Sequence, residues 1–124
     1  MKISDFALRT HVSTDTVRYY EKIGLLPPAR RDVSGHRQYD ERDLVWMEFL
    51  GRLKTTGMPI REMLTYAGLR ESGAGTEAER CEILKTHREQ VRAQISALSE
   101  SLNVLDTKIK TYETGLSGKG RPHD

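Results

Sequence analysis

A seven-residue repeat of apolar side chains in the C-terminal part of the chain constrains the fold most. No proline or glycine interrupts residues 76–113. Two interleaved sets of apolar residues recur there every seven residues, at alternating intervals of three and four: Leu84, Val91, Leu98, Leu105 and Tyr112, and Ile95, Leu102 and Ile109. This pattern is typical of a coiled coil, in which one face of a helix packs against another helix.

The length of this helix implies a partner. About 37 helical residues extend roughly 55 Å, and a compact unit formed by residues 1–71 is too small to cover a stripe of that length. We therefore predict that the eight repeated residues form a dimerisation surface, with the same helix of a second chain as the simplest partner. The alternative is a long helix that braces its own chain.

The composition fits one small domain plus this extended helix. Of the 124 residues, 36% are apolar, and 20 Lys and Arg against 18 Asp and Glu leave a net charge of only +2. That near-neutral charge excludes a protein that coats a polyanion through a long basic tail. No apolar run approaches the ~20 residues that cross a bilayer, and the N-terminus lacks a signal-peptide pattern. We expect a cytoplasmic protein that does not associate with a membrane.

Positive charge is concentrated at the N-terminus, in a segment with the signals of two short helices. Residues 1–39 carry seven Lys or Arg and four acidic residues. A helix over residues 5–10 precedes a turn and a second helix over residues 14–23, which Ser13 caps. The second helix turns Arg18 outward, and arginine matches the major-groove edge of guanine. This predicts a helix-turn-helix that reads DNA; the alternative is a helical hairpin with a solvated polar face.

The next segment predicts a small β-hairpin beside the second helix. Two consecutive prolines end any helix, and two short extended runs then flank a turn at Ser34 and Gly35. A hairpin attached to a helix-turn-helix is a wing. The basic side chains of this wing suit phosphate contact or entry into the minor groove: Arg30, Arg31, His36 and Arg37. The alternative is an exposed basic turn without a partner.

Two further helices are predicted before the long one. They cover residues 41–56 and 60–69, and the second turns Ile60, Met63, Leu64 and Ala67 inward. Trp46, Met47 and Met58 form a core in the simplest interpretation and a ligand-binding cluster in the alternative one.

The predicted domain organisation has three parts. Residues 1–71 form a DNA-binding domain that includes the two further helices, and residues 76–113 form the dimerisation helix. A joint at residues 72–75 separates the two, and residues 114–124 form a flexible tail, because both segments are rich in glycine.

Three short motifs follow one another at characteristic distances: TVRYYEKIGLL over residues 16–26, GHRQY over 35–39 and GMPIREM over 57–63. Together they resemble the MerR family of bacterial transcription regulators, and the resemblance covers roughly residues 1–112. It implies a mainly α fold, with a winged helix-turn-helix head, two linking helices and a long C-terminal dimerisation helix in an antiparallel coiled coil. Members of this family bind double-stranded promoter DNA as homodimers. Effector binding leads the dimer to distort the spacer between two promoter elements, so that RNA polymerase engages both.

The resemblance also assigns roles to individual residues. Arg18 would contact bases and backbone, Tyr19 and Tyr20 would support phosphate contacts, and Arg37 with Tyr39 would hold the backbone from the wing. The full predicted DNA-binding set is Ser13, Thr14, Thr16, Arg18, Tyr19, Tyr20, Arg31, His36, Arg37, Tyr39 and Lys54. His36 stands where the family more often has tyrosine. Asp15 is an acid on the reading helix, which leaves the operator sequence open.

The effector is not predicted, because the chain departs from the metal-sensing members. Its single cysteine, Cys81, cannot supply the several thiolates that soft-metal sites need, so we expect no metal and no cofactor. Cys81 is either a small core residue or a thiol that senses oxidants or aldehydes. A pocket for a small-molecule effector would have to form between the long helix and the linking helices of the dimer.

Two classes of function therefore remain at this stage. The leading hypothesis is a dimeric DNA-binding transcription regulator, and the rival is a coiled-coil adaptor whose head binds another protein. No paired carboxylates, nucleophile and base, or phosphate-binding glycine loop are present, so we predict no catalytic residues and no enzyme.

Overall fold

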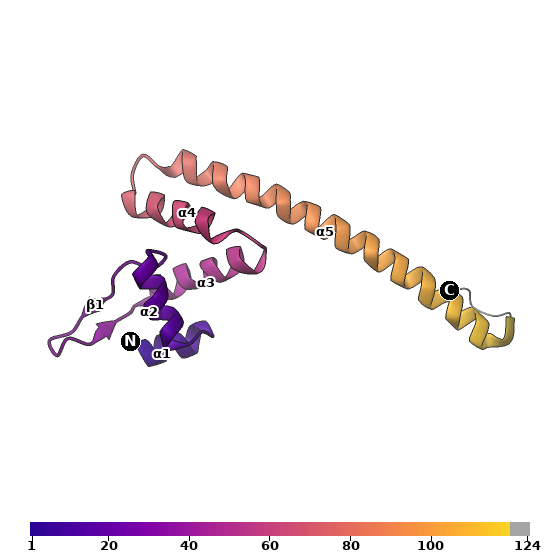
Figure 1. Cartoon of the computed structure of the whole chain (residues 1–124), viewed down its shortest axis with the longest axis horizontal. Coiled ribbons are helices and arrows are strands. Elements are labelled where there is room, and N and C mark those ends of the chain that lie inside the picture. The colour runs from indigo at the N-terminus through magenta and orange to yellow at the C-terminus, as the bar shows by residue number, and fades with distance from the viewer. Residues whose placement is uncertain (120–124) are drawn as a thin grey trace. The chain divides into compact units, whose positions relative to one another are not determined.

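The computed structural model describes residues 1–119 (Figure 1). Within these residues, five α-helices and one two-stranded antiparallel sheet follow one another along the chain. Their bounds are Ile3–Thr10 for α1, Thr14–Ile23 for α2, Arg30–Arg31 for β1, Arg37–Gln38 for β2, Glu41–Thr55 for α3, Ile60–Ser72 for α4 and Glu77–Thr114 for α5, with a π-helical turn at Gly115–Lys119. The predicted fold class, mainly α with a winged helix-turn-helix head and a long C-terminal helix, is confirmed.

The chain forms two compact units that divide inside α5. The first contains residues 1–84, and the second begins at Lys85. The first two turns of α5 therefore belong to the unit that holds the other helices. The non-helical break lies earlier, between the end of α4 at Ser72 and the start of α5 at Glu77, where the sequence predicted a joint.

The helix-turn-helix of the first unit begins two residues earlier than predicted. We expected the first helix to start at residue 5, but α1 starts at Ile3, and Lys2 precedes it in an extended conformation. The chain ahead of α1 is fixed by the wing, because the Tyr39 amide donates to the Met1 carbonyl at 2.8 Å. The prediction for α2 is confirmed at both ends, where Ser13 caps it and Gly24 ends it with φ of 90°.

The core of the first unit is built from α1, α2, α3 and α4. Its most completely buried large side chains are Phe6, Val17, Leu25, Leu26 and Leu50. Trp46, Met47 and Met58 are buried in the same cluster, which confirms core packing over a separate ligand-binding cluster. The Trp46 indole also donates to the Leu25 carbonyl at 2.8 Å, which fixes the loop between α2 and the wing against α3.

The α4 helix corrects one predicted core position. Ile60 was expected to point inward but is 49% exposed. Pro59 is the residue that caps α4, so Ile60 is the first helical residue and lies at the end of the helix rather than along its packed face. Met63, Tyr66 and Ala67 form that face instead, with the spacing of three and four expected of a helix.

In the second unit, α5 continues as one helix with its apolar stripe uncovered. The exposed members of the predicted dimerisation set are Ile95, Leu98, Leu102, Leu105, Ile109 and Tyr112, whereas Leu84 and Val91 are half-buried. The predicted flexible tail lies partly outside the described residues, and the part that is described, from Gly115 to Lys119, forms the π-helical turn.

Candidate nucleic-acid interface

The first turn of α2 presents a polar face held in place by its cap. The Ser13 hydroxyl accepts a hydrogen bond from the Thr16 amide at 3.0 Å and lies 2.9 Å from the Thr16 hydroxyl. One turn on, Arg18 is exposed, and its guanidinium donates to Asp15 at 3.2 Å. Because Asp15 is itself almost fully exposed, this pair leaves both side chains open to a groove of DNA.

The predicted tyrosines take two different positions. Tyr19 is 53% exposed, whereas Tyr20 and Tyr39 are 8% and 4% exposed. The Tyr39 ring stacks on Phe6 with centroids 4.3 Å apart. The structure therefore places Tyr20 and Tyr39 in the core behind the interface, and only Tyr19 of these three on its surface.

A shallow cavity of about 390 Å³ joins the reading helix to the end of α3. Its walls include Thr16 and Tyr19 from α2 and Lys54 from α3, with Met58 and Met63 at its base. Hydroxyls and an ammonium group arranged around an open cavity match the oxygens of a DNA phosphate. The structure thus brings Lys54 to two other predicted DNA-binding residues that are distant from it in sequence.

The wing is a tight hairpin whose turn is organised by one carboxylate. β1 and β2 pair Arg31 with Arg37. The Asp32 carboxylate accepts hydrogen bonds from the His36 amide at 3.0 Å and the Ser34 amide at 2.9 Å. The His36 amide contributes most to lowering the pKa of Asp32. Gly35 has φ of +83°, a conformation that side chains other than glycine rarely adopt.

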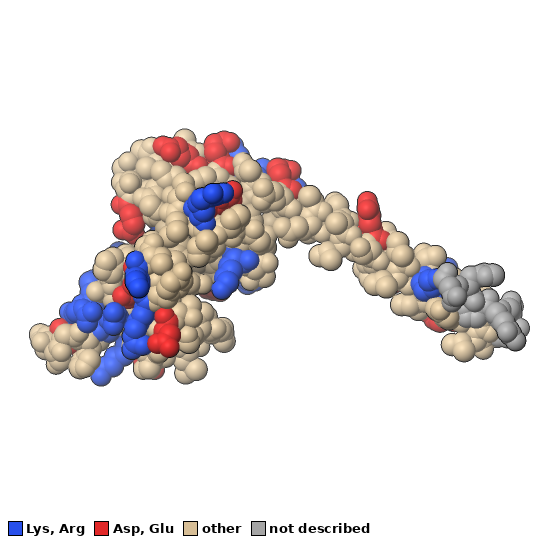
Figure 2. All heavy atoms as spheres, in the orientation of Figure 1, with Lys and Arg blue, Asp and Glu red and all other residues tan. Residues whose placement is uncertain are grey.

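Basic side chains gather on the surface formed by α2 and the wing (Figure 2). Arg31 and His36 are exposed there, and Arg37 is half-buried. The Arg31 guanidinium also donates to the Gly35 carbonyl at 2.6 Å, so it holds the turn while its surface stays open. These positions give a positive surface next to the reading helix, as the sequence predicted.

Sequence reasoning missed Glu21, which joins the reading helix to the wing. Its carboxylate accepts from the Arg37 guanidinium at 3.1 Å and from the Tyr39 hydroxyl, and only 11% of its side chain is exposed. Burial, followed by the hydrogen bond to Glu21, raises the pKa of Tyr39. An acid within a basic segment was the available signal, but its partners lie 16 and 18 residues away.

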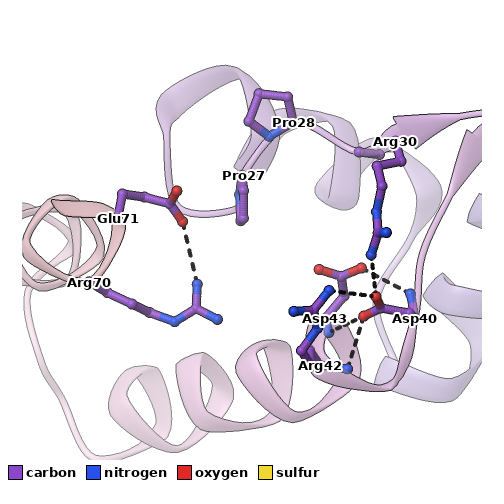
Figure 3. Close-up of a pocket in the computed structure, with 9 residues that line it drawn as sticks. Pro27, Pro28, Arg30, Asp40, Arg42, Asp43, Arg70 and Glu71 are labelled. Atoms are coloured by element: carbon purple, nitrogen blue, oxygen red, sulfur yellow. Dashed lines mark hydrogen bonds and ion pairs between the residues drawn. The ribbon is translucent and has the colours of Figure 1, made fainter. Parts of the chain in front are cut away.

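Asp40 anchors the other end of the wing to α3 (Figure 3). It accepts from the Arg42 and Asp43 amides as the cap of α3, and its carboxylate also binds the guanidinium of Arg30 at 2.5 Å and that of Arg42 at 3.3 Å. Figure 3 shows these contacts on one side of a pocket of about 490 Å³, with an Arg70–Glu71 ion pair on the other. Because Arg30 lies in β1 and Asp40 caps α3, their ion pair fixes the wing to α3.

The described residues hold no arrangement typical of a metal centre. No group of three His, Cys, Asp or Glu side chains within residues 1–119 is arranged to hold a metal ion. None of the helices in that part of the chain is long and apolar enough to cross a membrane. Cys81 is exposed on α5, so this chain does not bury it in its core.

The fold and the basic surface define the class. A helix-turn-helix followed by a wing, with arginine, threonine and tyrosine on the outer face of its second helix, is a DNA-binding module. Comparison with known protein families then identifies the group. A model described as MerR HTH family regulatory protein matches residues 1–66, and one described as MerR, DNA binding matches residues 44–108. The chain belongs to the MerR family, and it is a DNA-binding transcriptional regulator.

Individual relatives agree with this assignment. An HTH-type transcriptional regulator of Haemophilus influenzae is 34% identical over 82% of this chain and 76% of its own length. The HTH-type transcriptional regulator YyaN of Bacillus subtilis is 36% identical over 89% of this chain and 88% of its own length.

Solved structures show the same architecture. The crystal structure of a MerR family regulator from Listeria monocytogenes has a TM-score of 0.88 and 36% identity, and the match covers 95% of this chain and 89% of that one. The structure of HiNmlR, a MerR family regulator that lacks the sensor domain and is bound to promoter DNA, has a TM-score of 0.83 and 30% identity over 96% of this chain and 94% of that one.

Proposed function

We propose that this regulator binds promoter DNA as a homodimer and controls transcription initiation by distorting the spacer between two promoter elements. The observation that carries the proposal is the joint geometry of α2 and the wing, which Glu21 holds together as one basic surface. HiNmlR, a regulator of similar size and fold, is bound to promoter DNA, which supports the same mode here.

The residues divide between base reading and backbone contact. Arg18 and Asp15 lie where α2 would enter the major groove, and arginine donates to guanine while a carboxylate accepts from cytosine. Tyr19 and Lys54 face a shared cavity that suits one phosphate. Arg31 and His36 would contact the backbone from the wing, and Arg37 would do so while it holds Glu21.

Three of the predicted residues, Ser13, Tyr20 and Tyr39, hold this surface in place. The Ser13 hydroxyl is engaged in capping α2, where it fixes Thr14 and Thr16 at the helix N-terminus, a position that favours an anion. Tyr20 and Tyr39 pack in the core and hold α2 and the wing at their spacing. We therefore assign Tyr20 and Tyr39 a positioning role rather than direct contact with DNA.

The dimer follows from the uncovered stripe on α5. Six large apolar side chains of the predicted dimerisation set are exposed in the single chain, with exposed fractions from 43% to 70%. A contiguous apolar surface of this kind marks an interaction site, and a second copy of α5 buries it. The relatives are transcriptional regulators, and we infer that this chain likewise acts in the cytoplasm, by binding rather than by catalysis.

The decisive experiment is a gel shift with the DNA upstream of the protein's own gene. We expect the purified dimer to bind that fragment more tightly than a scrambled fragment of equal length. Arg18→Ala should weaken specific binding by about 1–3 kcal/mol per half-site and relax base preference. Arg9→Ala is the matched control, because Arg9 is exposed on α1 and pairs only loosely with Glu41, at 4.0 Å. Equal affinity of the native protein for both fragments would contradict the proposal.

A further inference from the structure

The turn of the wing holds one apolar side chain at its apex. Val33 lies between Asp32 and Ser34 in the turn that joins β1 to β2. This turn projects away from the helices of the first unit (Figure 1), and Val33 is completely exposed. Its side chain therefore adds no apolar burial to the core, and it is available to whatever the wing contacts.

Hydrogen bonds hold this apex in one conformation. The Gly35 amide donates to the Asp32 carbonyl at 3.0 Å, and the Asp32 amide donates to the His36 carbonyl at 2.9 Å. The Asp32 carboxylate also accepts from the Ser34 and His36 amides. Valine is itself stiff, because its branched β-carbon restricts rotation about χ1. Little conformational entropy is therefore lost when a partner buries the side chain of Val33.

Basic side chains stand on both strands beside this apolar apex. Arg31 and Arg37 pair across the hairpin, and Arg31 and His36 are exposed. Proteins that bind the minor groove of DNA combine the same two features, with cationic groups at the groove and an apolar side chain inserted into it. The apex of this wing therefore matches a minor groove better than it matches an exposed phosphate backbone.

A valine seated in the minor groove distinguishes base pairs through a single group. The acceptors on the groove floor are present in every base pair, so their desolvation does not discriminate, but a G·C pair adds the 2-amino group of guanine. Valine offers no acceptor to that amino group and displaces the water that would bind it. Leaving a buried donor unsatisfied costs free energy, so an A·T pair is favoured at this place.

We propose that Val33 is a specificity-determining residue, which sits in the minor groove beside the major-groove segment that α2 reads and favours an A·T pair there. The proposal rests on the proposed function, because α2 and the wing must bind the same duplex. Glu21 ties α2 to the wing, so the base pair that meets Val33 lies at a fixed distance from those that meet Arg18. Val33 thus adds to the operator a position that no hydrogen bond to a base reads.

Inosine tests this placement, because an I·C pair keeps the major-groove pattern of G·C but lacks the 2-amino group. In the DNA upstream of the protein's own gene, each base pair of the bound region is replaced in turn by G·C and by I·C, and fluorescence anisotropy measures both affinities. At one position in each half-site, we expect G·C to bind about fivefold or more weakly than I·C.

Two matched truncations assign this ratio to the wing. Val33→Ala should bring the ratio close to one at that position, because the shorter side chain no longer reaches the amino group. Val104→Ala makes the same change at another exposed valine, on α5, and should leave the ratio as it is in the native protein.

Cleavage of the DNA from the wing gives a second measurement. In a Cys81→Ser background, which removes the exposed native thiol, Val33→Cys carries an iron–EDTA reagent that cuts nearby sugars. Cuts staggered toward the 3′ ends of the two strands mark the minor groove, and cuts staggered toward the 5′ ends mark the major groove. We expect the 3′ stagger, centred on the position that inosine identifies.

The outcomes separate this inference from the proposed function. A protein that binds the promoter fragment specifically, but with equal affinity for G·C and I·C at every position, would overturn the inference and leave the proposed function intact. The same conclusion would follow from an unchanged ratio in Val33→Ala or from cuts staggered toward the 5′ ends. Equal affinity of the native protein for the promoter fragment and a scrambled fragment would overturn both.

Discussion

Among single side chains, Glu21 is the one whose structural role was hardest to predict from the sequence. Its side chain is nearly buried, and its carboxylate accepts hydrogen bonds from two residues of the wing, Arg37 and Tyr39. Loss of its charge would leave the Arg37 guanidinium without its carboxylate and the Tyr39 hydroxyl with a weaker acceptor. The spacing of α2 and the wing therefore depends on this residue more than on any exposed basic residue.

We predict that Glu21→Gln lowers the free energy of unfolding by about 1–3 kcal/mol, the cost of disrupting hydrogen bonds to a buried charged group. Urea denaturation followed by circular dichroism measures this change. The control is Glu41→Gln, whose partner Arg9 lies 4.0 Å away on an exposed surface, and it should change stability by less than about 0.5 kcal/mol. Equal effects of the two variants would show that Glu21 is not a structural contact.

Asp32 gives the wing a pH dependence at low pH. Hydrogen bonds from the backbone, first that of His36, lower the pKa of Asp32 from its ordinary value of 3.8. The pKa of Asp32 is therefore lower in the folded protein than in the unfolded chain. Its stabilisation of the turn is fully present above about pH 4, the ordinary range of an aspartate. This stabilisation is lost as the pH falls through the lower pKa of the folded state. An NMR titration should place the midpoint of the Asp32 carboxyl below that of a peptide covering residues 30–38. A midpoint equal to that of the peptide would refute the hydrogen-bonded turn.

The sequence was most informative for predicted residues that lie on the surface. Arg18, Tyr19 and Lys54 were predicted by their type and motif, and all three are on the surface. Tyr20 and Tyr39 belong to the same motifs but are buried, and Glu21 works through partners in another element. A motif shows which residues recur together, whereas packing decides which of them face the solvent.

Among whole elements, α5 supports the clearest test of dimerisation. We predict that Leu98→Asp converts the dimer to a monomer, because it places a charge at the middle of the apolar stripe. DNA binding should be lost together with it, since a single head makes too few contacts. Analytical ultracentrifugation and a gel shift measure the two effects.

Val104 provides the matched control for this prediction. It is also an exposed apolar residue of α5, at 68% against 70% for Leu98, but it lies outside the seven-residue repeat. Val104→Asp should leave the protein dimeric and able to bind DNA. If Leu98→Asp still sedimented as a dimer, or if both variants dissociated alike, the assignment of the stripe would be wrong.

The ends of a helix could be predicted where a side-chain cap fixes them. They were harder to predict where contacts with distant parts of the chain fix them. Ser13 caps α2 as predicted, and Asp40, whose side chain suits the same role, caps α3. The start of α1 depends instead on the pairing of Met1 with Tyr39, 38 residues away in sequence. In α4, Ile60 was predicted to face inward because it is apolar. It is exposed because it is the first residue of the helix.

At the scale of the whole molecule, the concentration of basic residues on the heads determines how binding responds to salt. Each phosphate contact releases counterions, so the logarithm of the binding constant should fall steeply and linearly with the logarithm of salt concentration. We predict that Lys54→Ala weakens binding to all sequences alike and reduces that slope by about one per lost contact. Fluorescence anisotropy over a salt series measures it, and an unchanged slope would place Lys54 away from the phosphates.

The assembly could be predicted because the sequence contains two clear signals. One is long and periodic, and the other is compact and specific. The seven-residue repeat indicated a partner helix, and three short motifs indicated the family of the head. The open surface around Val45 and Phe49 was not predictable, because its walls come from α3, α4 and α5, and Trp46 was the one residue among them that the sequence analysis assigned to the core. Only the packed chain shows that Val45 and Phe49 leave this part of the core open.

Arg88 interrupts the apolar repeat once in each chain, and this interruption affects partner choice. Its side chain is 56% exposed and contacts the neighbouring Glu89 at 3.6 Å, and it occupies the position seven residues before Ile95, where the repeat would place an apolar residue. A polar residue at such a position lowers stability but penalises shifted alignments. One arginine per chain would contribute to keeping this regulator paired with itself.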